Sequence, residues 1–178
     1  MLDLACGSGL MTQPLTNQGI DVVGLDFNYA ASLAAKQQLT HSVQGNAFQQ
    51  PFADNSFDSI VNCQFLNQQS PDDVASLFNE CHRILNDQGE LVLVWRNGEA
   101  YIHKLAHALF TLKDKLTNTP NFPVFDHPLS DVASTAKQAG FTVQQEFVFF
   151  SLFNWRITKP QSFIGKIFGA SGVMVLTK

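Results

Sequence analysis

The sequence predicts an α/β fold built on a mostly parallel sheet. Short apolar strands alternate with helical patterns along the chain, which is typical of parallel sheets. The first strand opens into a glycine-rich turn and then a helix. With 45% hydrophobic residues and sixteen Phe among 178 residues, the chain can bury one packed core. We therefore expect residues 1–178 to form a single domain.

The first two predicted strands carry the most informative residues. Residues 1–5 form an apolar strand that runs into Gly7-Ser8-Gly9, and a helix is expected over residues 10–18. Residues 21–25 form a second strand that ends at the carboxylate of Asp26. Glycines let backbone N–H groups approach a ligand without an intervening Cβ, and an acid at the tip of the next strand suits a ribose diol. The pattern indicates a site for a nucleoside-bearing cofactor.

The glycine turn differs from that of dinucleotide-binding proteins. Their Gly-x-Gly-x-x-Gly pattern has a third glycine where this chain has Thr12, which argues against a nicotinamide oxidoreductase. Instead the turn reads Asp3-x-Ala5-x-Gly7-x-Gly9. It resembles motif I of the class I S-adenosylmethionine-dependent methyltransferases, in particular the small-molecule, type 11-like group.

Three further segments extend the resemblance over residues 1–97, in the order found in the family. Gly45-Asn46-Ala47 resembles the family's Gly-Asp-Ala after strand three, residues 51–61 its run into strand four, and residues 80–94 its helix, turn and strand five. The resemblance implies a Rossmann-like, mostly parallel seven-stranded sheet with helices on both faces and an antiparallel last strand. Residues 1–97 would form the cofactor-binding half, and residues 98–178 the substrate-side half with a C-terminal hairpin.

The resemblance also implies S-adenosylmethionine as cofactor, with S-adenosylhomocysteine as product. Asp26 would bind the ribose, Phe27 would pack beside the adenine, and Asn46 would offer a carbonyl acceptor to it. Two alternatives stay open: Asp3 as a carboxylate that only shapes the turn, and Phe27 as a core aromatic. The residues expected to bind the cofactor are Asp3, Ala5, Gly7, Gly9, Asp26, Phe27, Asn46, Ala47, Cys63 and Gln64.

The other elements follow from caps and periodicity. Asn28 is expected to cap a helix over residues 29–39, and apolar residues at i, i+3 and i+4 predict a helix over 72–85. Gly89 is expected to separate that helix from a buried strand. Ser130 is expected to cap a helix ending at Gly140. The remaining expected segments are a strand at 91–95, a helix at 100–116, a Pro-rich loop at 118–128, a strand at 141–153, a short helix starting at 158 and a strand at 173–177.

Charge and cysteine content exclude several classes of partner. The net charge is −4 and no Lys/Arg cluster is present, which argues against a nucleic-acid partner. No apolar run reaches the length of a membrane span. Three cysteines without a disulfide pattern fit a reducing, cytoplasmic location. No metal is expected, because Cys6 and Cys63 lack ligand spacing and the pair His103 and His107 has no third ligand.

The resemblance implies transfer of a methyl group to a small-molecule acceptor. A general base is needed only for a hydroxyl or an acidic C–H acceptor, and none of Tyr101, His103, Asp126 and His127 has a spacing that marks it as one. No catalytic residue is therefore predicted. The family normally has helices before the first strand, so we expect a fragment, a misassigned start or a true start. A true start would imply that a partner chain, such as a second copy in a homodimer, covers the gap, or that activity is weak or lost. A non-catalytic cofactor-binding or interaction domain is the alternative function.

Overall fold

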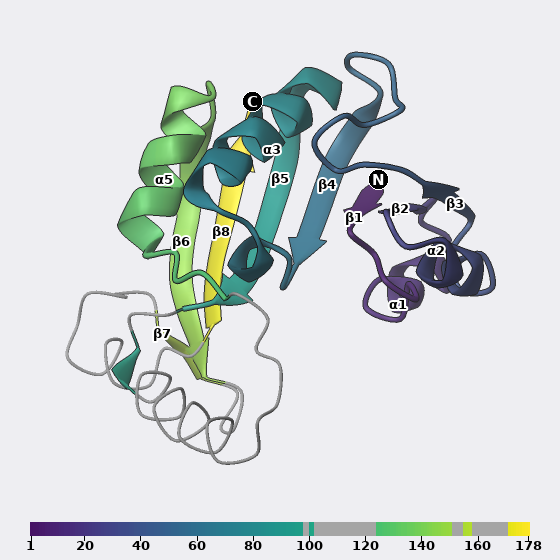
Figure 1. Ribbon diagram of the computed structural model, residues 1–178, viewed down its shortest axis with the longest axis horizontal. Coiled ribbons are helices and arrows are strands. Elements are labelled where there is room, and N and C mark those ends of the chain that lie inside the picture. Colours follow the sequence, from purple (N-terminus) through teal and green to yellow (C-terminus); the bar gives the residue numbers. More distant parts are fainter. Residues whose placement is uncertain (98–99, 102–123, 151–154, 158–170) are drawn as a thin grey trace.

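The protein is described from a computed structural model, which covers residues 1–97, 100–101, 124–150, 155–157 and 171–178 (Figure 1). Within these residues one eight-stranded sheet has the order β3-β2-β1-β4-β5-β8-β6-β7. Its strands are β1 Leu2–Leu4, β2 Val23–Asp26, β3 His41–Gln44, β4 Phe57–Cys63, β5 Leu85–Arg96, β6 Thr142–Phe150, β7 Trp155–Ile157 and β8 Ser171–Thr177.

The pairing of the strands confirms the predicted Rossmann-like sheet. Strands β1 to β5 pair in parallel, and β8 lies antiparallel between β5 and β6. The short edge strand β7, antiparallel to β6, is an addition to the seven strands that the resemblance implies. The predicted antiparallel last strand is therefore confirmed.

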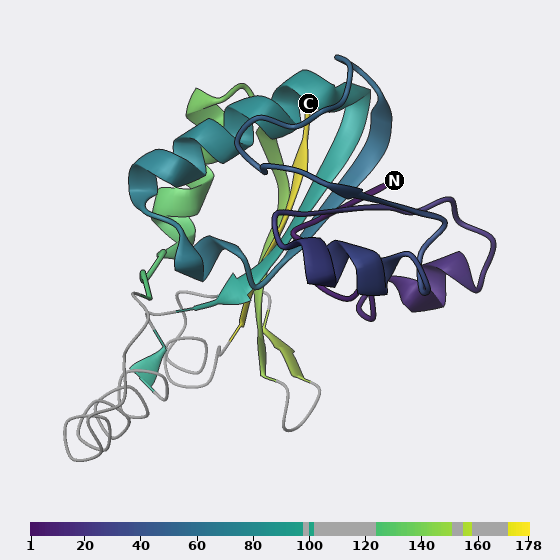
Figure 2. The same ribbon diagram turned by 45° about the vertical axis from the view of Figure 1, so that its right-hand side comes forward.

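Helices lie on both faces of the sheet, as expected (Figure 2). They are α1 Gln13–Thr16, α2 Tyr29–Ala35, the 3-10 helix η1 Leu66–Gln68, α3 Pro71–Ile84 and α5 Leu129–Gln138. Leu2 and Leu4 belong to the large core beneath α3 and α5. Asp3, between them, points to the other face, where it meets Thr12 just before α1.

Helix α3 follows its sequence signals closely. The Ser70 hydroxyl accepts a hydrogen bond from the Asp73 N–H, and the Asp73 carboxylate accepts one from the Ser70 N–H, which forms a capping box. The predicted apolar face is buried at Val74, Leu77, Phe78, Cys81 and Ile84. These residues fix α3 on the sheet beside β4 and β5.

The junction after α3 differs from the prediction. The helix ends at Ile84 and β5 begins at Leu85, so Gly89 lies inside the strand and does not precede it. Leu85 already pairs with Phe57, and the register with β4 shifts before Ser59. An added Cβ at Gly89 would lie 2.9 Å from the Asn86 carbonyl oxygen, so this irregular stretch requires glycine. The requirement reflects strand geometry, not a helix stop.

Three other helix boundaries also differ. Helix α1 spans Gln13–Thr16 alone, because residues 7–12 form turns and a bend and Pro14 stands at its start. Asn28 caps α2 as predicted, since its Oδ1 accepts from two backbone N–H groups, but the helix ends at Ala35. The predicted Ser130 cap is wrong: α5 begins at Leu129 after Pro128, and the Ser130 hydroxyl donates to Asp131. Most of the expected helix at 100–116 and that at 158, with His103 and His107, lie outside the described residues.

Candidate functional site

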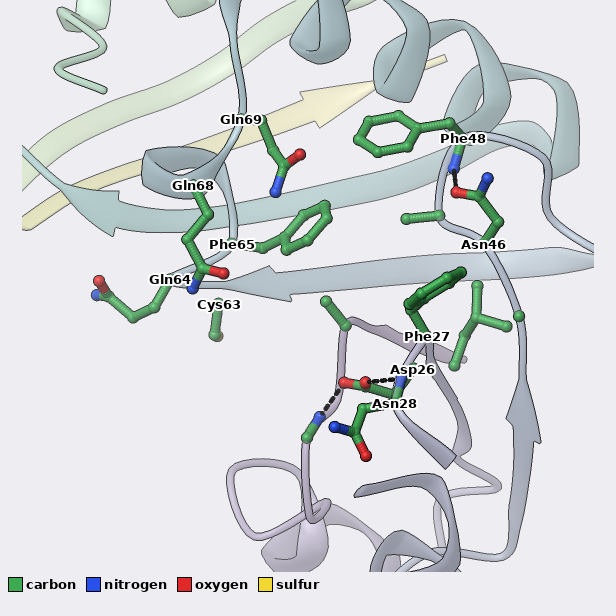
Figure 3. A pocket seen from close by; sticks show the side chains of 15 residues that line it. Asp26, Phe27, Asn28, Asn46, Phe48, Cys63, Gln64, Phe65, Gln68 and Gln69 are labelled. Carbon is green, nitrogen blue, oxygen red and sulfur yellow. Dashed lines mark hydrogen bonds between the residues drawn. The ribbon is translucent and has the colours of Figure 1, made fainter. Parts of the chain in front are cut away.

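A cavity of about 650 Å³ opens at the carboxyl ends of β1, β2 and β4 (Figure 3). Ligands of open α/β sheets bind at this edge. The lining residues are Ala5, Gly7, Leu25, Asp26, Phe27, Asn28, Gly45, Asn46, Ala47, Phe48, Cys63, Gln64, Phe65, Gln68 and Gln69. All the residues predicted to bind the cofactor are among them except Asp3 and Gly9.

The glycine turn after β1 presents open backbone to the cavity. Ala5, Gly7 and Gly9 have φ values of 58°, 55° and 78°, in the left-handed region that favours glycine. A Cβ added at Gly7 would meet no atom within 4 Å, whereas one added at Gly9 would lie 2.8 Å from Leu39 Cγ. Gly7 therefore leaves space for a ligand, and Gly9 leaves space for the packing of Leu39.

Asp26 joins the first two loops at the cavity. Its Oδ2 accepts a hydrogen bond from the Gly7 N–H and its Oδ1 one from the Asn28 N–H, both at 2.8 Å (Figure 3). A carboxylate oxygen can accept two hydrogen bonds. Each oxygen of Asp26 thus keeps a lone pair with which to accept from a vicinal diol.

The loop after β3 forms a second wall. The Gly45 N–H donates to the Asp26 carbonyl at 3.0 Å, which sets the loop beside β2. The Asn46 Oδ1 accepts from the Phe48 N–H at 2.9 Å, so the predicted adenine acceptor already holds one hydrogen bond. Phe27 is 77% exposed and lines the cavity, which excludes the alternative of a core aromatic.

Asp3 lies behind the glycine turn and outside the cavity wall. It is 3% exposed, and its Oδ2 accepts from the Thr12 hydroxyl at 2.5 Å. Burial raises the pKa of the Asp3 carboxyl, and the charge of Asp26 raises it further, while the Thr12 hydrogen bond lowers it. This position corresponds to the turn-shaping alternative.

The end of β4 forms the wall opposite the glycine turn. Gln64 has φ 61°, and its N–H donates to the Val94 carbonyl at 2.7 Å. Burial raises the pKa of the Cys63 thiol, and raises that of Cys6 to about 12, so both are protonated at neutral pH. Among the described residues, no three His, Cys, Asp or Glu side chains gather as metal ligands would.

Helix η1 supplies part of the wall that sequence reasoning missed. Asn67 holds it in place: its Nδ2 donates to the carbonyls of Arg96 and Phe125, and its Oδ1 accepts from the Arg96 N–H. The lining residues outside the set predicted to bind the cofactor are Leu25, Asn28, Gly45, Phe48, Phe65, Gln68 and Gln69. Several adjoin motif residues, which was an available signal, but nothing local marks Gln68 and Gln69.

The candidate bases Asp126 and His127 have structural positions. His127 is 5% exposed, and its Nε2 lies 2.9 Å from the Gln69 carbonyl oxygen. The Trp95 indole N–H donates to the His127 carbonyl at 2.9 Å, and Asp126 lies 3.7 Å from the Arg96 guanidinium. Both residues hold the segment near residue 126 against β5 and η1.

Comparisons with known proteins agree with this geometry. The family described as "Methyltransferase domain" matches residues 2–93, more than half of the chain. The "Ubiquinone biosynthesis O-methyltransferase" of Pseudomonas aeruginosa (strain UCBPP-PA14) is 27% identical over 153 residues, which cover 81% of this chain and 65% of that protein. The "Demethylmenaquinone methyltransferase" of Paenarthrobacter aurescens is 31% identical over 137 residues, covering 70% and 52%.

A solved structure supports the fold. The SAM-dependent methyltransferase of Methanosarcina mazei superposes with a TM-score of 0.75 at 20% identity, over 99% of this chain and 91% of that one. The chain spans 65% of the length of the Pseudomonas relative. From the family match, the strand order and the cavity together, the chain belongs to the class I S-adenosylmethionine-dependent methyltransferases.

Proposed function

We propose that the chain binds S-adenosylmethionine in the cavity and catalyses transfer of its methyl group to a small-molecule acceptor. The observation that carries the proposal is Asp26, whose two oxygens are oriented by the N–H groups of Gly7 and Asn28 and keep lone pairs for a ribose diol. The names of two relatives, both quinone-pathway methyltransferases, support the same class of reaction.

The chemistry of the lining residues fits this cofactor better than a phosphate-bearing one. Asp26 is the only carboxylate among the described lining residues, and none of them is Lys or Arg. A ligand with an ammonium and a sulfonium needs no cation from the protein, whereas a pyrophosphate would favour one. The open space at Gly7 and the rings of Phe27 and Phe48 suit a nucleoside with a short aliphatic tail.

The bound cofactor supplies an electrophilic methyl group, so the protein has to position the acceptor and exclude water. On the acceptor side we assign positioning to the carboxamides of Gln64, Gln68 and Gln69, with the Phe65 ring as an apolar wall. Neutral amides and an aromatic ring favour a planar, uncharged acceptor with an oxygen to hold. We assign no general base among the described lining residues.

A partner and a location complete the proposal. None of the described helices is long and apolar enough to span a membrane. The cytoplasmic location and a homodimer that covers the sheet stay predictions from the sequence, as does the division into halves at residue 97. Sedimentation of the purified chain tests the homodimer, with a monomer as the contradicting result.

Calorimetric titration with S-adenosylhomocysteine tests the cofactor site. The wild-type chain should bind, and Asp26→Asn should lose about ten- to a hundredfold in affinity, because two charge-assisted hydrogen bonds weaken. Asp87→Asn, an exposed acid at the amino-terminal end of β5, is the matched control and should bind as the wild type does. If a folded wild-type chain shows no binding, the result would favour the alternative of a non-catalytic interaction domain.

A further inference from the structure

Arg83 lies on α3, outside the cavity, yet its guanidinium is fully engaged. Its Nε and Nη2 donate to the two oxygens of Glu80 at 3.0 and 2.8 Å, and its Nη1 donates to Asp54 at 2.7 Å. Its other two N–H groups donate to the carbonyls of Phe52 and Gln50, at 2.9 and 3.1 Å. All five donors of the side chain are therefore used, and together they fasten the segment 50–54 to α3.

Gln50 continues this network toward the cavity. Its N–H donates to the Glu80 Oε2 at 2.9 Å, and its side-chain Nε2 donates to the Ala47 carbonyl at 2.9 Å. Gln50 is 4% exposed, so water competes little for these bonds. Ala47 lines the cavity, whereas Gln50, Glu80 and Arg83 do not. A continuous set of hydrogen bonds thus joins α3 to a wall of the cavity.

The wall at residues 45–48 depends on such support because it is a loop. At its start, Gly45 is bonded to Asp26, and the Gln49 N–H donates to the Asn46 carbonyl within the loop. An added Cβ at Gly45 would lie 2.7 Å from Leu25 Cδ1 and 3.2 Å from Pro51 Cδ, so the loop packs closely on both sides. Within the part of the chain that the structure describes, the Gln50 side chain is the donor that ties the Ala47 carbonyl to the rest of the fold.

We propose that Arg83 and Glu80, acting through Gln50, are positioning residues that hold the Asn46–Ala47 wall in its ligand-binding conformation. The inference rests on the proposed function for the identity of the ligand, an S-adenosyl nucleoside. Arg83 forms a fork-to-fork pair with Glu80, a geometry that Lys cannot reproduce. Loss of the fork would release Gln50 and with it the Asn46–Ala47 wall, while the glycine turn and Asp26 would stay in place.

Two variants test this proposal. Gln50→Met keeps the volume of the side chain and removes its hydrogen bond to Ala47, and Arg83→Lys keeps the charge and removes the fork. Each should weaken S-adenosylhomocysteine binding about tenfold in calorimetry. The loss should be equal for 5′-methylthioadenosine, because the affected wall contacts the nucleoside and not the amino-acid tail. In the ligand-free protein, the backbone amides of residues 46–48 should exchange hydrogen faster.

A destabilised control separates positioning from stability. Val74→Ala removes a buried apolar contact of α3 without touching the network, so it should lower the melting temperature and leave both affinity and exchange at residues 46–48 unchanged. Wild-type affinity and wild-type exchange in Gln50→Met would overturn the inference, as would an equal loss of affinity in Val74→Ala. If the wild-type chain itself does not bind, the proposed function fails, and unchanged exchange in the variants would then overturn the network's role as well.

Discussion

Asp26 and Gly7 together combine a hydrogen-bond acceptor with open space at one point of the cavity. The carboxylate is oriented by two backbone N–H groups, and the glycine beside it leaves room where a side chain would stand. Gly9, two residues on, serves packing, since its missing Cβ makes room for Leu39. Neighbouring glycines of one motif thus have different physical roles.

Alanine at the two glycines should separate these roles. Gly9→Ala should destabilise the fold by about 1–3 kcal/mol, through a left-handed φ and the contact with Leu39. Gly7→Ala should cost only about 1 kcal/mol for its φ, but should abolish S-adenosylhomocysteine binding by filling the cavity. Urea unfolding and calorimetry on both variants check this, and normal ligand binding by Gly7→Ala would contradict the assigned role.

Asp3 makes the stability depend on pH. Burial raises the pKa of its carboxyl in the folded state above its ordinary value, so stability falls as pH rises from below that ordinary value through the folded pKa. Asp3→Asn keeps an acceptor for the Thr12 hydroxyl and removes the buried charge. The variant should therefore gain stability over the wild type at pH 7 and lose that gain at pH 3. Urea unfolding at both pH values checks this, and an equal difference at both would contradict it.

At the scale of the element, α3 connects the core to the cavity. Its apolar face packs against the sheet, while Glu80 and Arg83 bind the backbone of Gln50, which follows the Asn46–Ala47 wall. A helix whose start is fixed by a capping box and a proline keeps these side chains in register along its length. Stability of the helix start and geometry of the network are distinct properties that variants can separate.

Removal of the cap of α3 should lower stability. Ser70→Ala breaks the hydrogen bond to the Asp73 N–H and should reduce the free energy of unfolding by about 0.5–2 kcal/mol. Ser76→Ala, on the exposed side of the same helix, is the control and should change it by less than about 0.5 kcal/mol. Chemical denaturation measures both, and equal effects would show that the cap contributes nothing specific.

At the scale of the whole molecule, the parallel half of the sheet and most of the cavity are predictable from the sequence. Asp26, Asn46 and Cys63 stand where strands end, and parallel strands bring those ends to one edge. The residue types at these strand ends are therefore enough to predict that part of the cavity.

The features that the sequence did not predict depend on distant contacts. Gln68 and Gln69 reach the cavity because the Asn67 side chain donates hydrogen bonds to the carbonyls of Arg96 and Phe125 and so fixes η1 in place. For Asp3 the sequence left the turn-shaping alternative open, and its burial and the hydrogen bond from Thr12 favour that alternative. Such tertiary hydrogen bonds override local propensity and spacing.

The most direct test of the cofactor site is a crystal structure of the chain with S-adenosylhomocysteine. We expect both ribose hydroxyls to donate to the Asp26 carboxylate, with the adenine between Phe27 and the wall at Ala47 and the amino-acid tail beside Gly7. Ligand density away from this cavity, or in it with the ribose turned away from Asp26, would contradict the proposed site.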